Sequence, residues 1–294
     1  MRNNMKTLVL MATLGAIFVG VGQLIGGTSG AIGALVFAGL LNFAMYFFSH
    51  KIALMSTGAK PVEENQVPNV YGIVRSLAQR ENLPMPKIYL IQAPQPNAFA
   101  TGRNPNHAVV AVTTGILEMM DQTELEGVLA HEMSHVRNRD ILIASIAATV
   151  ATALSFLVRM TLWSNLGGDR RRNDAFSGII FLVSIILAPL AAMVIQMAIS
   201  RGREYEADRS GSEMTGSPLA LARALAKLEQ GTTRIPMQVN PSTAQLFIAD
   251  PLKAFGRRGS GSGGGGITRM FSTHPPIAER IARLEEMAQG GLIR

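Results

Sequence analysis

Residues 131–135 read His131-Glu132-Met133-Ser134-His135, and this stretch decides how the rest of the sequence is interpreted. On an α-helix, residues four apart lie on one face, so both imidazoles can bind the same metal ion while Glu132 reaches its water molecule. Residues 123–130 are typical of a helix that leads into this stretch. The pattern therefore predicts a helix that carries two metal ligands and a carboxylate base.

Zinc fits this pattern, because it lowers the pKa of a bound water toward ~7 and the neighbouring carboxylate can then take the proton. A catalytic zinc needs a third protein ligand, and the chain has no cysteine to supply it. Glu204 and Asp208 are four residues apart and share a helix face, whereas Glu206 points away. This spacing predicts one ligand and one carboxylate that orients a ligating histidine. His50 and His107 are expected to be structural or solvated.

The composition favours a membrane protein. Apolar residues make up 48% of the chain, charged residues only 16%, and the mean hydropathy is +0.23. Such apolar content excludes a disordered or fibrous chain, and the lack of cysteine excludes a disulfide framework or a thiol nucleophile. The net charge is +7, but the basic residues lie beside apolar runs. This arrangement favours a lipid bilayer over nucleic acid as a partner.

Uncharged runs predict four membrane spans. Residues 7–50 hold no charged side chain over 44 positions, which accommodates two spans joined by a turn at Gly26–Gly30. Further runs cover residues 141–158 and 175–200, for which buried core helices are the alternative. A cleaved signal peptide is disfavoured for the first run, because the run is too long and no A-x-A site follows.

The spans divide the chain into four parts. We expect two spans in residues 1–50, a polar segment at 51–140, two further spans with a short external loop in 141–199, and a second polar segment at 200–294. Most Lys and Arg near the predicted span ends fall on one side: Arg2, Lys6, Lys51, Lys60, Arg137, Arg139, Arg201, Arg203 and Arg209. Only residues 170–172, all arginine, fall on the other. We therefore expect a protein of the inner membrane. The charge bias places both of its termini and both polar segments in the cytoplasm.

The polar segments contain alternating helix and strand patterns. The first segment predicts a helix over Val70–Gln79, strands over Lys87–Gln92 and Ala108–Thr113, a loop over Pro94–Asn106, and a helix from a cap at Asp121 through Arg137. The second segment opens with a helix leaving the membrane. It continues with a helix over Pro218–Gln230, a loop over Thr232–Pro241, a flexible linker over Gly259–Gly266 and an amphipathic helix over Pro276–Gln289.

Distances along the helices place the candidate ligands together. His135 precedes Ile141 by six residues, roughly 9 Å along a helix, and Glu204 follows Ile199 by five residues, about 8 Å. An even number of predicted spans separates the two positions, so they return to the same side of the membrane at a similar height. The sequence thus predicts that two membrane helices continue into the active site.

Several motifs together resemble the HtpX-type membrane metalloproteases, which are related to the type I CAAX prenyl proteases and the Oma-type proteases. The resemblance rests on the four apolar runs, His131–His135, Ser200–Asp208, Asn97–Gly102 and Ser272–Pro276. It implies a multi-pass α-helical membrane protein with a cytoplasmic zincin-like α+β protease domain. It also implies one zinc ion per chain.

The same resemblance assigns roles to individual residues. It implies His131, His135 and Glu204 as zinc ligands, Glu132 as general base and Asp208 as the carboxylate behind a ligand. Transition-state stabilisation falls to His274 and Arg280, although His274 can equally cap the helix after it, and Arg280 can pair with a helix carboxylate. Substrate contacts fall to Asn97 and to an edge strand around Ala108, Val109, Val110 and Ala111.

The leading hypothesis is a zinc endopeptidase that cleaves misfolded or damaged membrane proteins at the cytoplasmic face. A prenyl-protein endopeptidase is disfavoured, because four spans offer no obvious enclosed chamber for a lipidated tail. An intramembrane protease is disfavoured because Asp121, Glu124 and Glu126 precede the histidines in a polar segment. An inactive membrane scaffold is disfavoured because Glu132 accompanies both histidines. The sequence does not define the oligomeric state.

Overall fold

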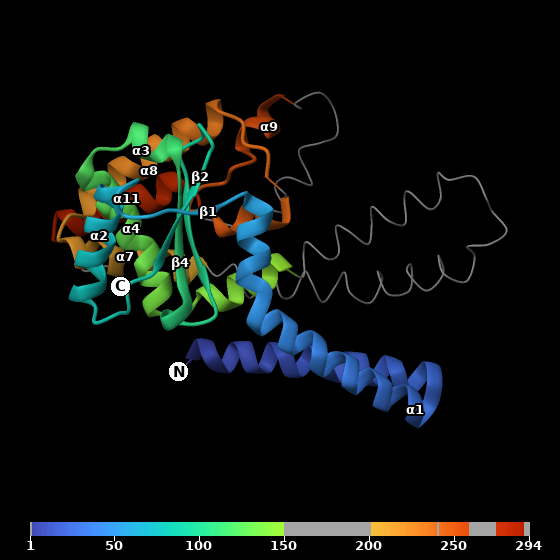
Figure 1. Cartoon of the computed structure of the whole chain (residues 1–294). Helices are drawn as coiled ribbons and strands as arrows, with labels where there is room; N and C mark the ends of the chain where they lie inside the picture. The colour runs from blue at the N-terminus through green and yellow to red at the C-terminus, as the bar shows by residue number, and fades with distance from the viewer. Residues whose placement is uncertain (1, 150–200, 240, 259–274, 291–294) are drawn as a thin grey trace.

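The computed structural model describes residues 2–149, 201–239, 241–258 and 275–290. Figure 1 shows a small β-sheet covered by helices, with a long helical hairpin, α1, projecting from one side. The predicted linker at 259–266, His274 and most of the predicted spans at 141–158 and 175–200 lie outside the described residues. Residues 141–149 are helical, as the third run predicts.

The first apolar run forms α1 (Arg2–Thr57), which is two helices joined by a sharp break. Gly26 and Gly27 leave helical geometry, and Gly27 adopts φ 58° with ψ −146°, a conformation open in practice only to glycine. The two arms contact each other, since the Asn42 side chain donates to the Met11 carbonyl at 3.1 Å. The predicted turn at Gly26–Gly30 is therefore confirmed.

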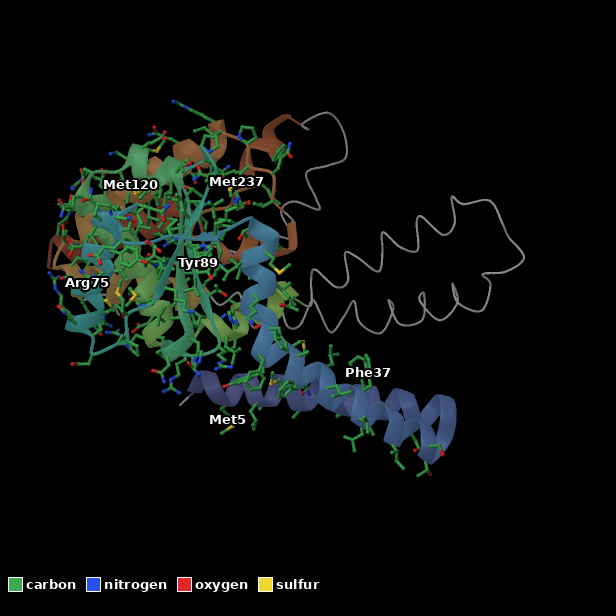
Figure 2. All side chains as sticks on the ribbon, viewed as in Figure 1. Met5, Phe37, Arg75, Tyr89, Met120 and Met237 are labelled. Carbon is green, nitrogen blue, oxygen red and sulfur yellow. The ribbon has the colours of Figure 1, made fainter. Side chains whose placement is uncertain are left out.

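One helix in the described part of the chain, Gly26–Thr57, is long and apolar enough to cross a membrane. Its apolar side chains face outward. Phe37 is 54% exposed, and Figure 2 shows it on the projecting part of the hairpin, away from the sheet. The C-terminal end differs, because Ala53 and Leu54 are buried against the sheet. The hairpin thus joins an apolar arm to the folded body, whereas two complete spans in this run remain a prediction.

The sheet has four strands in the order β1-β2-β4-β3. They are β1 (Lys60–Pro61), β2 (Lys87–Ile91), β3 (Ala98–Gly102) and β4 (Ala108–Thr113). β4 runs parallel to β2 and antiparallel to β3. The strands predicted around β2 and β4 are confirmed, but the loop predicted over Pro94–Asn106 is wrong. This segment contains β3 and a 3-10 turn, η1 (Pro105–His107). All five residues of β3 are buried, so its sequence lacks the alternation of apolar and polar residues that predicts a strand.

The expectation that Ala108–Thr113 forms the edge of the sheet is also wrong. Residues Ala108, Val109, Val110 and Ala111 belong to β4, which pairs with β2 on one side and β3 on the other. Both rows of β4 backbone groups are therefore occupied by neighbouring strands. β3 forms the edge instead, and it packs against α4.

Helices cover one face of the sheet. In chain order the helices after α1 are α2 (Pro68–Arg80), α3 (Thr114–Met119), α4 (Gln122–Arg137), α7 (Arg201–Thr215), α8 (Pro218–Arg234), the 3-10 helix η2 (Pro241–Leu246), α9 (Lys253–Arg258) and α11 (Ile277–Ala288). Of these, η2 packs with α1 on the other face of the sheet. The predicted helices near α2, α4, α7, α8 and α11 are confirmed. A core formed by Val110, Val112, Leu129 and Leu225 fills the space between sheet and helices.

The opposite face of the sheet carries a smaller core. Phe99 and Val109 pack there against Leu54 of α1 and Phe247. The Phe99 and Phe247 rings meet edge to face, with centroids 5.1 Å apart. The sheet is thus held between the helical layer and the C-terminal end of α1 (Figure 1).

Capping fixes the start of α4. The Asp121 side chain accepts a hydrogen bond from the Glu124 backbone, and the Glu124 side chain accepts one from the Asp121 backbone, which completes the predicted capping box. Glu124 is almost fully buried, and Lys227 of α8 donates to its carboxylate at 2.5 Å. These contacts tie the N-terminus of α4 to α8 and so fix the helix that carries residues 131–135.

Helices α7 and α4 pack so closely that their backbones are in contact. A Cβ atom placed on Gly211 would lie 2.8 Å from the backbone nitrogen of His131 and 3.0 Å from the carbonyl carbon of Ala130. Only glycine allows this approach without moving one of the helices. The contact sets how far α7 stands from the predicted metal-binding face.

We predict that Gly211→Ala lowers the unfolding free energy by about 1–3 kcal/mol, the usual cost of overpacking a close contact. The control is Gly72→Ala on the exposed face of α2, where a Cβ meets nothing within 4 Å. Gly72→Ala is expected to be neutral or stabilising by about 0.5–1 kcal/mol, because alanine favours the helix. Thermal unfolding in detergent measures both. Equal stability of the two variants would contradict the close α4–α7 contact.

Candidate metal centre

The two histidines of α4 lie one turn apart and turn their Nε2 atoms toward each other. These atoms are 3.3 Å apart, and the rings meet edge to face with centroids 4.8 Å apart. His131 is buried and His135 is partly exposed. Glu132, between them in sequence, is also buried. The helix therefore presents both imidazoles on one face, as the spacing of four predicts.

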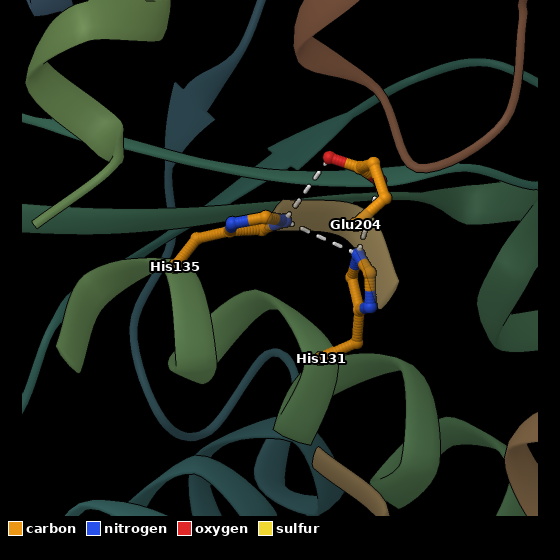
Figure 3. Close-up of side chains that lie close together, drawn as sticks. All are labelled: His131, His135 and Glu204. Carbon is orange, nitrogen blue, oxygen red and sulfur yellow. Dashed lines mark hydrogen bonds and ion pairs between the residues drawn. The ribbon is translucent and has the colours of Figure 1, made fainter. Parts of the chain in front are cut away.

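Glu204 approaches the histidines from α7. Its two carboxylate oxygens lie 3.7 Å from Nε2 of His131 and 3.6 Å from Nε2 of His135. The three ligand atoms all lie within 4.8 Å of one another. Figure 3 shows the three side chains converging from the two helices. The structure thus brings together the three residues that the sequence analysis names as ligands.

This donor set fits a zinc ion. Zinc binds imidazole nitrogen and carboxylate oxygen in tetrahedral sites at about 2.0–2.2 Å, which puts neighbouring ligand atoms about 3.3–3.5 Å apart. The observed separations of 3.3, 3.6 and 3.7 Å lie close to that spacing. Three protein ligands beside a pocket leave room for the open position that a catalytic metal requires.

Each histidine is held from behind by a carboxylate. Nδ1 of His131 lies 2.9 Å from Asp208 of α7, and Nδ1 of His135 lies 3.3 Å from Asp140. Such contacts fix the ring orientation and leave Nε2 free to bind the metal. Asp208 stands where the sequence analysis expects an orienting carboxylate. Glu206 is exposed, in agreement with the helix-face argument.

Asp140 is a site residue that the sequence reasoning missed. It follows the end of α4, where Arg139 adopts φ 59° and turns the chain, and the Asp140 amide donates back to the His135 carbonyl at 3.0 Å. The sequence analysis takes Asp140 only as the border of an apolar run. The sequence does contain a signal for this role, because an aspartate stands five residues beyond a ligating histidine at the end of a helix.

Arg280 lies behind the ligands. It is fully buried, and its guanidinium donates to both Asp208 oxygens at 2.7 and 2.6 Å. Burial opposes its charge, but Asp208 more than offsets this, so the pKa of Arg280 is raised. In turn, although burial acts to raise the pKa of Asp208, the charge and hydrogen bonds of Arg280 hold it below its usual value. This geometry indicates a positioning role; direct action of Arg280 on a transition state remains a prediction.

The site has an excess of buried negative charge. Burial raises the pKa of Glu132, and the neighbouring Glu204 carboxylate raises it further. Burial lowers the pKa of His135, but the hydrogen bond to Asp140 and the Glu204 and Glu132 charges raise it to about 9. The carboxylates therefore favour a positive charge between them. A divalent cation bound there would neutralise this negative charge and would displace the proton from His135.

Other candidate residues lie away from the ligands. His107 is exposed, and its ring contacts Arg103 and Asn104, as expected for a solvated histidine. Asn97, predicted to contact substrate, is buried, and its amide donates to the Ala249 carbonyl at 2.8 Å. A substrate role for Asn97 remains a prediction. Ala100 of β3, which the sequence analysis does not single out, lines the pocket with His131 and Glu132.

Comparison with protein families agrees with this geometry. Residues 64–288 match the model of peptidase family M48. The chain belongs to peptidase family M48. The match includes α4, α7 and α11, and so all three candidate ligands. This membership confirms the family predicted from the sequence motifs.

Individual M48 relatives match over nearly the whole chain. A "Protease HtpX homolog" of Thermodesulfovibrio yellowstonii is 52% identical over 289 residues, which cover 98% of this chain and 99% of the relative. A protein of the same name from Aquifex aeolicus is 48% identical, with coverage of 93% and 89%. A further one from Burkholderia ambifaria is 48% identical, with coverage of 99% of both chains.

A solved structure has a related fold. The crystal structure of S. mikatae Ste24p superposes with a TM-score of 0.51 at 20% identity, covering 97% of this chain. The present chain spans 66% of the length of that protein. At this identity the likeness supports the M48 fold alone.

We predict a fixed order of zinc loss among three α7 variants. Glu204→Ala removes a ligand oxygen and should lower zinc stoichiometry most. Asp208→Ala leaves three ligands but frees the His131 ring, for which affinity losses of about 10–100-fold are typical. Glu206→Ala, on the exposed face, is the matched control and should bind zinc like the wild type. Metal analysis of purified protein measures the order, and greatest loss in Glu206→Ala would contradict the assigned ligand.

Proposed function

We propose that this chain is a membrane zinc endopeptidase that hydrolyses peptide bonds of misfolded or damaged membrane proteins at the cytoplasmic face. The observation that carries this proposal is the convergence of His131, His135 and Glu204, with Glu132 buried beside them. Membership of peptidase family M48 supports proteolysis as the reaction.

The chain's own residues supply the acid–base part of the reaction. When bound, zinc would acidify water to a pKa near 7 and polarise a substrate carbonyl. Glu132 accepts the proton of the attacking water and then passes this proton to the leaving amine. Asp208 and Asp140 hold the two imidazoles in place during this transfer.

Substrate binding is assigned to the edge of the sheet. β3 is an edge strand, the Ala100 backbone hydrogen-bonds the Glu132 side chain, and Ala100 lines the pocket beside Glu132. An extended peptide pairing with this strand would bring its carbonyl groups past the ligands. β3 thus takes the role that the sequence analysis gives to Ala108–Thr113.

The choice of substrate rests on the position of the site near apolar segments. The helix that begins at Ile141 starts the third uncharged run, and Ile141 and Ala144 line the metal pocket. The helix Gly26–Thr57 packs its last residues on the sheet. We infer that the polar segments lie at the cytoplasmic surface of the inner membrane, with four spans below them. Polypeptide segments that leave the bilayer would then reach the site.

We predict that Glu132→Gln preserves the fold and bound zinc but lowers casein cleavage by at least ~10²-fold, because the variant lacks the base. Activity should also disappear on chelation of the wild type and return with added zinc. Measurement requires purified protein in detergent, with zinc content determined on the same samples. Near wild-type cleavage by zinc-loaded Glu132→Gln would contradict the role of Glu132 as base, whereas absence of zinc-dependent cleavage by the wild type would favour a scaffold protein.

The orientation is tested by cysteine labelling, which the absence of native cysteine makes unambiguous. Cysteines at Ser56 and Ser260 should react with a membrane-impermeant thiol reagent only after lysis. A cysteine at Asn173 should react in intact spheroplasts. Labelling of Ser260→Cys but not Ser56→Cys in intact spheroplasts would place Glu204 and the histidines on opposite sides, contrary to the shared site.

A further inference from the structure

A short segment of the second polar region closes one side of the metal pocket. Residues Gln245–Ala249, here called the strap, comprise the last two residues of η2 and the three residues after it. Four strap residues, Gln245–Ile248, line the pocket that contains the three ligands and Ala100. Leu246, Phe247, Ile248 and Ala249 are buried. The strap is therefore part of the wall that any bound substrate must meet.

The strap is anchored from two sides. The Asn97 amide donates to the Ala249 carbonyl at 2.8 Å, and the Ala249 amide donates back to the Asn97 side chain at 3.3 Å. On the other side, Arg280 donates to the Ile248 carbonyl at 3.2 Å. The Phe247 ring packs on Phe99 of β3. These contacts hold the strap as a fixed element.

The strap also occupies part of the sheet edge. The Thr113 amide donates to the Asn97 carbonyl, so the carbonyl of the next residue, Ala98, points away from β4. The Ile248 amide donates to that Ala98 carbonyl at 3.0 Å. By the same alternation, Ala100 and Gly102 also turn their backbone groups outward. The strap therefore uses the Ala98 end of the edge. The remaining outward groups lie at Ala100, whose backbone hydrogen-bonds the Glu132 side chain, and at Gly102.

The pocket next to this remaining edge is lined partly by apolar side chains and partly by the ligands, Glu132, Asp140, Arg203 and Gln245. Leu246 and Ile248 come from the strap, while Ile141 and Ala144 come from the helix after α4. Ala144 has the smallest side chain of the four, and it is only partly buried. The part of the pocket formed by these four side chains favours an apolar residue of limited size and disfavours a charged one.

We propose that the strap selects the substrate: it confines backbone pairing to Ala100–Gly102 and, with Ile141 and Ala144, forms an apolar subsite for a side chain that flanks the cleaved bond. This inference rests on the proposed peptidase function and specifies its substrate class. The preferred substrates are extended peptides with Leu, Ile, Met or Phe at that position. Asn97 acts through the strap as a positioning residue.

Two variants change the subsite in opposite directions. Ala144→Leu fills the subsite, so the ratio of kcat/KM for a Leu peptide to that for an otherwise identical Ala peptide should fall by about 10-fold or more. Leu246→Ala enlarges the subsite and should raise the ratio of kcat/KM for a Phe peptide to that for the otherwise identical Leu peptide. Ala282→Leu, on the exposed face of α11, is the matched control and should leave both ratios unchanged. Zinc content is measured for all variants.

The cleaved bond is located first by mass spectrometry of casein digested by the zinc-loaded wild type. Enrichment of apolar residues on one side of the cleaved bonds supports the inference. Cleavage without any such preference, or equal ratios in Ala144→Leu and the wild type, would overturn the subsite while leaving the peptidase function intact. Absence of zinc-dependent cleavage in the wild type would overturn both.

Hydrogen exchange tests the strap without relying on turnover. The zinc-loaded Glu132→Gln protein is compared with and without an excess of a Leu-containing peptide taken from a mapped cleavage site. A fixed wall predicts that exchange at Gln245–Ala249 stays equal or slows on peptide addition, while β3 becomes better protected. Faster exchange of the strap would show that peptide displaces it, which would overturn its role as a selecting wall. Asn97→Ala should raise strap exchange before any peptide is added.

Discussion

The backbone contact between α4 and α7 is the constraint on which the site depends. Gly211 lies against His131 with no room for a side chain, and Glu204 stands two helical turns before it on the same helix. At that separation a carboxylate from α7 reaches both Nε2 atoms of α4. The capping box and the Lys227–Glu124 ion pair hold the start of α4, so the metal-binding turn is fixed from two directions.

The charges around the ligands are balanced by pairing. Buried carboxylates are costly unless they have partners, and Asp208 has both Arg280 and His131. Asp140 contacts His135 and lies 3.8 Å from Arg203. Glu204 faces the two Nε2 atoms, and Glu132 is buried next to them. The remaining negative charge is therefore concentrated where a cation would bind. Arg280 contributes twice, because it also holds the strap through Ile248.

The sequence predicts those features of the structure that depend on residues close together in the chain. The spacing of His131, His135, Glu204 and Asp208 follows from helix geometry, and the residues meet as expected. The glycines at 26 and 27 marked the turn of α1 for the same kind of reason. The edge strand was not predictable in this way. Its place depends on the order of strands in the sheet, which is a non-local property, and the small residues of β3 show no alternation. Asp140 and the strap were missed because a backbone turn and long-range hydrogen bonds bring them to the site.

The central claim is that His131, His135 and Glu204 bind one zinc ion between α4 and α7. X-ray absorption at the zinc edge, recorded on the purified full chain, tests it most directly. The account predicts one zinc per chain with two imidazole nitrogens at about 2.0–2.1 Å and oxygen ligands at about 2.0–2.2 Å. A chain that takes up no zinc, or a zinc spectrum without the imidazole signature, would contradict it.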